Sequence, residues 1–263
     1  MGLLDGRVLV TGATGGIGRA IASAFARRGA SLILTGRRED VLRSLAAELR
    51  AQAVVCDLAD REQVDRLIVQ AGRVDVLAAN AALPGAGALT DFTQEQLDRV
   101  LEVNLRAPIA LARSLAPGMI ARGEGHLVFM SSLNGRLASP LSSAYSASKF
   151  GLRGFALGLR QDLRRHGVGV SVVMPGFVSE AGLFADTGAR LPVGVGTRSP
   201  AEVATAVIRA VERNRAEVEV APLGVRLGAA IGGVAPGLAA WATRLARGEK
   251  IAAEIATGQR RKL

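Results

Sequence analysis

The segment TGATGGIG occupies residues 11–18, directly after a short apolar run at residues 7–11 and directly before a helical pattern. Glycines let the backbone turn sharply and approach a pyrophosphate, whose charge is stabilised by the free N–H groups of a helix N-terminus. Because this turn follows the first strand of a chain in which strands and helices alternate, it predicts a dinucleotide site. The expected contacts are Gly12, Thr14, Gly15, Gly16, Ile17 and Gly18.

Strand-like and helical patterns alternate up to about residue 222. β-Branched or Leu-rich runs lie at residues 7–11, 31–35, 53–56, 74–80, 126–131, 168–174 and 217–221. Helical patterns lie at residues 17–28, 39–50, 60–71, 93–122, 145–166 and 200–214. Thr93 with Gln96, and Ser199-Pro200 with Glu202, have the spacing of helix starts. These βαβ units predict an α/β fold: a single-domain, Rossmann-type, doubly wound parallel sheet of about seven strands with helices on both faces.

Composition and charge narrow the class of protein. The chain has 263 residues, of which 49% are hydrophobic and 21% charged, as in globular proteins. The formal net charge is +10, but the cations are spread along the sequence and aromatic residues make up only 3%, so nucleic acid is not expected as a partner. A positive field instead favours a small anionic cofactor. The single cysteine, Cys56, is expected to be a buried thiol.

The second predicted strand ends in Thr35-Gly36-Arg37-Arg38. At this strand end an acidic side chain would bind the ribose hydroxyls of NAD, whereas arginines would pair with the 2'-phosphate of NADP. Gly36 stands where the acid would be, so the sequence predicts NADP (NADPH) as cofactor, with Arg37 and Arg38 as contacts. The alternative is that both arginines belong to a solvated helix start.

A tyrosine and a lysine share one face of a predicted helix. Tyr145 is the only tyrosine, and Lys149 follows four residues later. An adjacent ammonium and the positive end of a helix are expected to lower the pKa of the phenol, which suits acid-base catalysis. Ser132 lies at the end of the fifth predicted strand, 13 residues before Tyr145, where its hydroxyl could polarise a carbonyl.

The glycine turn, Asn104, Ser132, Tyr145 and Lys149 together resemble the short-chain dehydrogenase/reductase family in its shorter branch, over residues 5–222. The resemblance implies hydride transfer between a nicotinamide and a carbonyl or secondary alcohol. Tyr145 would exchange a proton with the substrate oxygen and Ser132 would hold that oxygen. Lys149 would bind the nicotinamide ribose, and Asn104 would hold a water in a relay to Lys149. The alternative for Asn104 is an ordinary polar residue of a helix.

Further cofactor contacts follow from the same resemblance. Asp57, beside Leu58, would meet the adenine amino group, and Asn80 would belong to the motif that ends the fourth strand. Pro175, Gly176 and Val178 would border the nicotinamide. A helix cap is the alternative for Asp57, and a structural turn is the alternative for Asn80.

Two motifs depart from the family pattern. Residues 79–82 read Ala-Asn-Ala-Ala where the family has Asn-Asn-Ala-Gly. Ser179 and Glu180 continue the segment after Val178, where the family has a threonine that contacts the carboxamide. Ser179 is the candidate that replaces this threonine.

The predicted organisation is a dinucleotide-binding and catalytic domain at residues 1–222, with a lid at residues 181–198, and a C-terminal extension at residues 223–263. The lid segment is Gly-rich and longer than a compact domain requires, although a passive insertion would look the same. The extension is apolar and ends in Arg260-Arg261-Lys262. It could cap the substrate site, pack between subunits, or make a peripheral contact with an anionic membrane. The resemblance implies a homodimer or homotetramer.

Apolar segments that would face the substrate predict a lipophilic ketone or secondary alcohol. They lie at residues 82–89 and 133–143 and in the lid, at Leu183, Phe184, Leu191 and Val193. Arg136 could instead attract a carboxylate or phosphopantetheine, which makes a 3-oxoacyl thioester reductase an alternative. A non-catalytic NADP-binding regulatory protein and a membrane-associated scaffold are alternatives from other classes.

Two further expectations concern metal and location. His126 and His166 lack a second metal-type ligand at useful spacing, so no metal site is predicted. The start of the chain has no signal-peptide pattern, because Arg7 interrupts its first apolar run, and a cytoplasmic location is expected.

Overall fold

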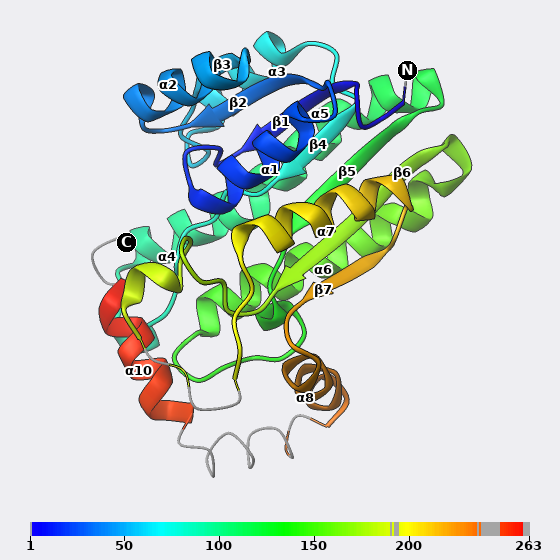
Figure 1. The fold of residues 1–263 in the computed structure, drawn as a ribbon. Coiled ribbons are helices and arrows are strands. Elements are labelled where there is room, and N and C mark those ends of the chain that lie inside the picture. Colours follow the sequence, from blue (N-terminus) through cyan, green and yellow to red (C-terminus); the bar gives the residue numbers. More distant parts are fainter. Residues whose placement is uncertain (1, 190, 192–194, 236, 238–247, 260–263) are drawn as a thin grey trace.

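Seven parallel strands form one sheet in the order β3-β2-β1-β4-β5-β6-β7 (Figure 1). The strands are β1 (Arg7–Thr11), β2 (Ser31–Gly36), β3 (Gln52–Val55), β4 (Val76–Ala79), β5 (Gly125–Met130), β6 (Val168–Pro175) and β7 (Glu217–Val220). The chain runs outward from β1 to β3 and then returns to β4, so the strand order reverses between β1 and β4. In open parallel sheets, ligands bind at the carboxyl ends of the strands beside this reversal. The predicted doubly wound sheet is confirmed.

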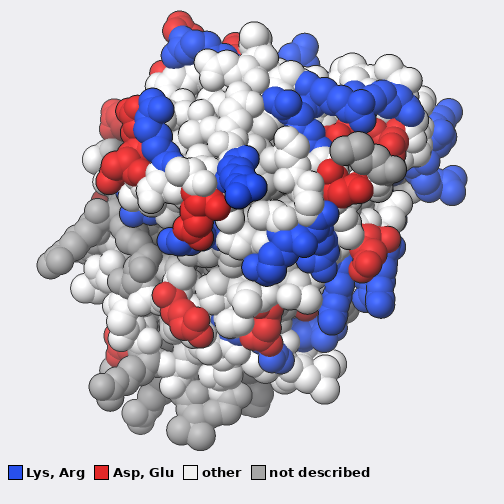
Figure 2. All heavy atoms as spheres, turned by 45° about the horizontal axis from the view of Figure 1, so that its top comes forward, with Lys and Arg blue, Asp and Glu red and all other residues white. Residues whose placement is uncertain are grey.

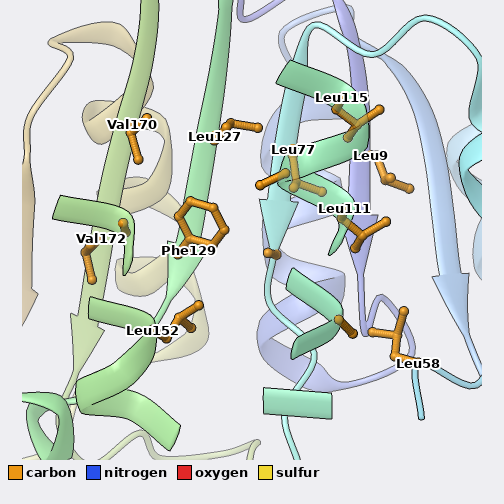
Figure 3. Packing of buried hydrophobic residues seen from close by; sticks show 14 of the residues in the cluster. Leu9, Leu58, Leu77, Leu111, Leu115, Leu127, Phe129, Leu152, Val170 and Val172 are labelled. Atoms are coloured by element: carbon orange, nitrogen blue, oxygen red, sulfur yellow. The ribbon is translucent and has the colours of Figure 1, made fainter. Parts of the chain in front are cut away.

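Helices cover both faces of the sheet in this computed structural model. One face is covered by α1 (Gly16–Ala26), α2 (Glu39–Leu49) and α7 (Pro200–Glu212). The other is covered by α3 (Arg61–Ala71), α4 (Gln94–Leu101), α5 (Ala107–Arg122) and α6 (Ser143–Leu163). Figure 3 shows the second core, where Leu77 and Phe129 of the strands lie near Leu111 of α5 and Leu152 of α6. Because the strands are buried on both faces, they are nearly continuous apolar runs.

Both predicted helix starts are confirmed as capping boxes. The Thr93 hydroxyl accepts from the Gln96 N–H, and the Gln96 side chain accepts from the Thr93 N–H. Ser199 and Glu202 make the same pair of bonds at the start of α7. Each box satisfies two N–H groups that would otherwise have no partner in the helix.

The single helix expected at residues 93–122 is interrupted. A π-helical turn, η2 (Glu102–Arg106), separates α4 from α5. Such a turn adds residues without ending the helical hydrogen bonding, so the apolar pattern of the sequence does not mark it. Asn104 lies inside this turn, and single π-turns within helices are frequent at functional sites.

The C-terminal extension contains helices that the sequence pattern does not reveal. They are α8 (Leu223–Val234) and α10 (Gly248–Gln259). Their many Gly and Ala residues give little periodic signal. The predicted lid holds one short turn, η5 (Ala185–Thr187), and a bridge between Val178 and Arg198 joins its two ends. The helix α10 packs against η5.

The structure describes residues 2–189, 191, 195–235, 237 and 248–259. The expectations for Val193 and for the basic end at residues 260–262 lie outside this part of the chain. Within it, no helix is long and apolar enough to cross a membrane. On the face seen in Figure 2, basic and acidic side chains are interspersed.

Candidate active site

A cavity of about 1200 Å³ opens at the carboxyl ends of the strands, beside the reversal between β1 and β4. The predicted cofactor contacts, apart from Ser179, line this cavity together with Ser132. These contacts are Gly12, Thr14, Gly15, Gly16, Ile17, Gly18, Arg37, Arg38, Asp57, Leu58, Asn80, Tyr145, Lys149, Pro175, Gly176 and Val178. Residues from Gly12 to Val178, which are far apart in the sequence, therefore meet in one place.

The glycine turn has no room for side chains where its backbone closes. Gly12 has φ +65°, and a Cβ on Gly12 would lie 2.8 Å from Ala81 Cα. A Cβ on Gly18 would lie 2.1 Å from the Gly12 carbonyl oxygen. Among the residues described at the start of α1, the N-cap Gly15 has no side-chain bond and the first turn carries no acid. The N–H groups at this helix start are therefore available to an anion, which fits the pyrophosphate of a dinucleotide.

Asn80 holds this turn to the end of β4. Its Nδ2 donates to the Thr11 carbonyl oxygen at 3.0 Å. The Thr11 hydroxyl accepts from the N–H groups of Asn80 and Ala81, at 3.0 and 3.1 Å. The hydrogen bonds of Asn80 therefore fit the alternative that it is a residue of a structural turn. Asn80 also lines the cavity.

The end of β2 has little room for an acidic side chain and is followed by two arginines. A Cβ on Gly36 would lie 3.0 Å from the Thr14 side chain, so an acidic residue at this position would crowd the glycine turn. The Arg38 guanidinium donates to the Thr14 carbonyl oxygen. Arg37 is exposed at the cavity, where its guanidinium can pair with a 2'-phosphate.

Asp57 is engaged within the chain. Arg99 Nη2 lies 2.5 Å from one carboxylate oxygen, and the other accepts from the Ala59 N–H at 3.0 Å. Although partial burial opposes ionisation, these bonds hold the pKa of Asp57 below its usual range. Asp57 therefore lines the cavity as a paired, ionised carboxylate. No pattern in the sequence points to Arg99, which lies 42 residues away in α4.

Tyr145, Lys149 and Ser132 come together as predicted. Lys149 Nζ lies 5.6 Å from the centroid of the Tyr145 ring and donates to the Met130 carbonyl oxygen at 3.0 Å. Ser132 hydrogen-bonds with the Tyr145 hydroxyl. The helix α6, which carries both Tyr145 and Lys149, is tied to the end of β5 because the Ser131 hydroxyl donates to the Lys149 carbonyl oxygen at 3.0 Å.

The expected lowering of the phenol pKa is not found among the chain's own groups. Burial raises the pKa of Tyr145 to about 12, and the Ser132 hydrogen bond offsets this only in part. Burial also lowers the pKa of Lys149 to about 7, so the lysine is only partly charged at neutral pH. Removing both groups from water favours their neutral forms. Tyr145 therefore keeps its proton throughout the neutral range.

Asn104 is buried behind the cavity wall. Its Oδ1 accepts from the Leu83 N–H at 2.7 Å, and its Nδ2 donates to the Leu83 carbonyl oxygen at 2.9 Å. Nδ2 also lies 3.3 Å from the Ser148 hydroxyl. The side chain thus fastens the loop after β4 to α6. The relay to Lys149, implied by the resemblance, stays a prediction.

The far end of the cavity is apolar, and the C-terminal extension helps to form it. Leu133, Leu137 and Phe184 line this end. The helices α8 and α10 add side chains that no sequence pattern predicts: Val225, Ala229, Ala252, Ile255 and Gln259. Gln259 Nε2 donates to the Leu183 carbonyl oxygen at 3.1 Å, which joins α10 to the lid. The C-terminal extension could cap the substrate site, pack between subunits or contact a membrane, and these contacts support the first of these roles.

Two of the predicted substrate and cofactor contacts are engaged within the chain. The Arg136 guanidinium pairs with Glu219 of β7, and Arg226 lies 3.0 Å from the same carboxylate. Arg136 is therefore not a free cation for a carboxylate or phosphopantetheine. The Ser179 hydroxyl donates to the Arg198 carbonyl oxygen at 3.4 Å, whereas its neighbours Val178 and Glu180 line the cavity. Ser179 holds the base of the lid and does not replace the family threonine.

Cys56 and His126 are core residues. Cys56 is buried, and burial raises the pKa of its thiol to about 11. His126 is 1% exposed, and Nε2 lies 2.8 Å from the Ser171 hydroxyl. Burial and the nearby Arg160 lower the pKa of His126 to about 3, so the imidazole stays neutral.

Comparison with known proteins shows the family to which the chain belongs. The family model described as short chain dehydrogenase matches residues 7–190, so the chain belongs to the short-chain dehydrogenase family. Dehydrogenase/reductase SDR family member 7B of Xenopus tropicalis is 37% identical over 244 residues, covering 84% of this chain and 79% of the relative. Ketoacyl reductase HetN of Nostoc sp. is 36% identical over 222 residues, covering 81% and 77%.

A solved structure has the same fold. The short-chain dehydrogenase from Sphingobium yanoikuyae in complex with NADPH superposes with a TM-score of 0.77 at 28% identity, covering 88% of this chain and 94% of the other. Its strands and ours therefore form the same kind of sheet, and the fold assignment rests on both sequence and structure.

Proposed function

We propose that this protein is an NADP-dependent oxidoreductase that transfers a hydride between the nicotinamide and a lipophilic carbonyl or secondary alcohol. The observation that carries the proposal is the meeting of Tyr145, Ser132 and Lys149 in the cavity that also holds the glycine turn. The nucleotide-bound structural neighbour supports a nicotinamide cofactor, and Gly36 with Arg37 supports the phosphorylated form.

Ser132, Tyr145 and Lys149 each have a separate role in the proposed reaction. A bound nicotinamide nucleotide supplies or accepts the hydride. Ser132 holds the substrate oxygen, and the Tyr145 hydroxyl donates its proton to that oxygen as the carbonyl is reduced. Because its raised pKa keeps the phenol protonated at neutral pH, Tyr145 is in the form that donates a proton when a carbonyl is reduced. Lys149, held by the Met130 carbonyl, lies where it can bind a ribose hydroxyl beside the phenol.

The substrate class follows from the apolar end of the cavity. Leu133, Phe184 and Ile255 provide no charge there, so an extended hydrocarbon group fits. A 3-oxoacyl thioester is the second candidate, because two relatives are named as a ketoacyl reductase and a 3-oxoacyl-[acyl-carrier-protein] reductase. With Arg136 paired to Glu219, the acyl chain would supply most of the recognition. The homo-oligomer and the cytoplasmic location stay predictions from the sequence.

The test combines cofactor binding with turnover. NADPH and NADH are titrated by fluorescence, and NADPH oxidation is then followed with a panel of alkanones, 3-oxoacyl N-acetylcysteamine thioesters and short sugars. We expect turnover of apolar carbonyls, and a loss of about 10²- to 10⁴-fold in Tyr145→Phe, which should still bind NADPH. NADPH binding with equal, background turnover in both proteins would instead identify a non-catalytic nucleotide-binding protein.

Cofactor choice is tested at Arg37. Arg37→Asp removes a charge-assisted contact worth roughly 1.5–3 kcal/mol, so NADPH affinity should fall by about 10- to 100-fold. NADH affinity should change little. Arg165→Asp changes the charge equally at an exposed position in η4 (Arg164–His166), which lies outside the cavity lining, and should leave the NADPH:NADH ratio unchanged. Equal losses in both variants would mean that only the overall positive field matters.

A further inference from the structure

The helix α8 exposes a continuous apolar stripe. Its residues Leu223, Leu227, Ile231 and Val234 are 66%, 55%, 55% and 88% exposed. Their spacing places them along one side of the helix. The other large apolar side chains that are exposed in the described chain occur on separate elements: Val55, Val69, Leu89, Leu101 and Phe150. A stripe of this kind, unlike single exposed residues, marks an interaction surface.

The opposite side of α8 belongs to the cavity. Val225 and Ala229 line its apolar end, and Ala229 is buried. Figure 1 shows α8 at the lower edge of the molecule, beyond the end of β7. The helix is thus apolar on both sides. In the described chain, the side chains on its outer side are exposed.

The sequence segment that contains α8 has a positive net charge. The sequence contains no Asp or Glu between Val220 and Gly248, where it has three arginines. The nearest acid before this segment, Glu219, is already paired with both Arg136 and Arg226. A second copy placed on the same face would bring two acid-free, positively charged segments together. An anionic surface would complement them.

We infer that the outer face of α8 docks on the surface of an anionic lipid bilayer. The 12-residue helix is too short to span a bilayer, so it lies in the interface with Leu223, Leu227, Ile231 and Val234 among the acyl chains. The positive net charge of this acid-free segment attracts the lipid phosphates. Docking of this kind brings the apolar end of the cavity to the membrane surface.

Vesicle sedimentation of the full chain tests this inference. Vesicles of pure phosphatidylcholine are compared with vesicles that also contain phosphatidylglycerol, at low and high salt. We expect binding to the anionic vesicles that weakens as salt increases. Binding should fall about tenfold in Val234→Asp, which removes one aliphatic side chain from the interface. Leu227→Asp with Ile231→Asp should abolish it.

The matched control is Val69→Asp. Val69 is an 80% exposed valine on α3, so the same substitution adds the same charge away from the stripe and should leave vesicle binding unchanged. Equal losses in Val69→Asp and Val234→Asp would overturn the inference. So would an absence of binding, or α8 variants that change only the sedimentation mass of the protein, which would identify a second copy as the partner. Vesicle binding requires no turnover, so this test is independent of the proposed reaction.

Discussion

The end of the cavity proposed to bind the nucleotide (the nucleotide end) is made from turns at the ends of adjacent strands. The end proposed to bind the substrate (the substrate end) is made from the lid, α8 and α10. At the nucleotide end, Asn80 and Thr11 tie the turns to one another, and Gly18 leaves no space for even a methyl group. At the substrate end, apolar side chains from distant parts of the chain meet. The comparison predicts that small substitutions at the nucleotide end abolish cofactor binding or activity. Substitutions at the substrate end should be tolerated and should change which substrates are turned over.

Lys149 lies where the two ends meet, and its loss should have the largest effect. Lys149→Met is expected to lower kcat by about 10²- to 10⁴-fold. It should also change how stability depends on pH. The lysine has a pKa of about 7 when folded, against 10.5 in the unfolded chain, so the unfolded chain binds more protons between these values. The wild-type free energy of unfolding should therefore gain a rising contribution from pH 7 toward pH 10.

Urea unfolding at pH 7, 8.5 and 10 measures this contribution. Lys149→Met should lack it and should be more stable than the wild type at pH 7, because no charge has to be buried. Tyr145→Phe keeps the lysine and should keep the rise. Identical pH profiles for the wild type and Lys149→Met would show that the lysine is not desolvated.

Gly18→Ala tests the tightness of the nucleotide end. The new methyl group would lie 2.1 Å from the Gly12 carbonyl oxygen, so the turn must shift. We expect a loss of about 1–3 kcal/mol in unfolding free energy, as for other overpacked sites, and NADPH binding about tenfold weaker. Gly154→Ala in α6 is the control, because a Cβ there would meet no heavy atom of the described chain within 4 Å, apart from its neighbours in the helix. It should gain up to about 1 kcal/mol and bind NADPH normally.

Ala252→Phe tests the substrate end and should have the smallest effect. Ala252 of α10 lines the cavity, whereas its neighbour Ala253 is exposed. The larger side chain should lower kcat/KM about tenfold for a long alkanone such as 2-dodecanone, as for other pocket contacts worth about 1–3 kcal/mol. Activity with 2-butanone and NADPH affinity should not change. An equal loss in Ala253→Phe would mean that α10 acts through general packing rather than through contact with substrate.

The nucleotide end could be predicted because its signals are short in sequence. The glycine turn, the end of β2 and the pair formed by Tyr145 and Lys149 each lie within a few residues, and each follows a strand or a helical pattern. Strand alternation alone then brings these motifs to one edge of the sheet, where the structure places them.

Other features could not be predicted because they depend on contacts between distant residues. The sequence leaves Arg136 available to a substrate anion, yet its partner Glu219 lies 83 residues further along the chain. Asp57 pairs with Arg99, for which no local pattern exists. A neighbouring lysine predicts a lower pKa for Tyr145, but burial raises that pKa, and the extent of burial is a property of the whole fold.

The sequence by itself therefore determined the sheet, the family and which side chains gather at the carboxyl ends of the strands, since local patterns specify which residues end each strand. Only the tertiary structure decided which charged groups are neutralised, how far the phenol and the ammonium are removed from water, and that α10 closes over the lid through Gln259 and Leu183. These properties depend on packing between segments far apart in the chain, which short sequence patterns do not encode.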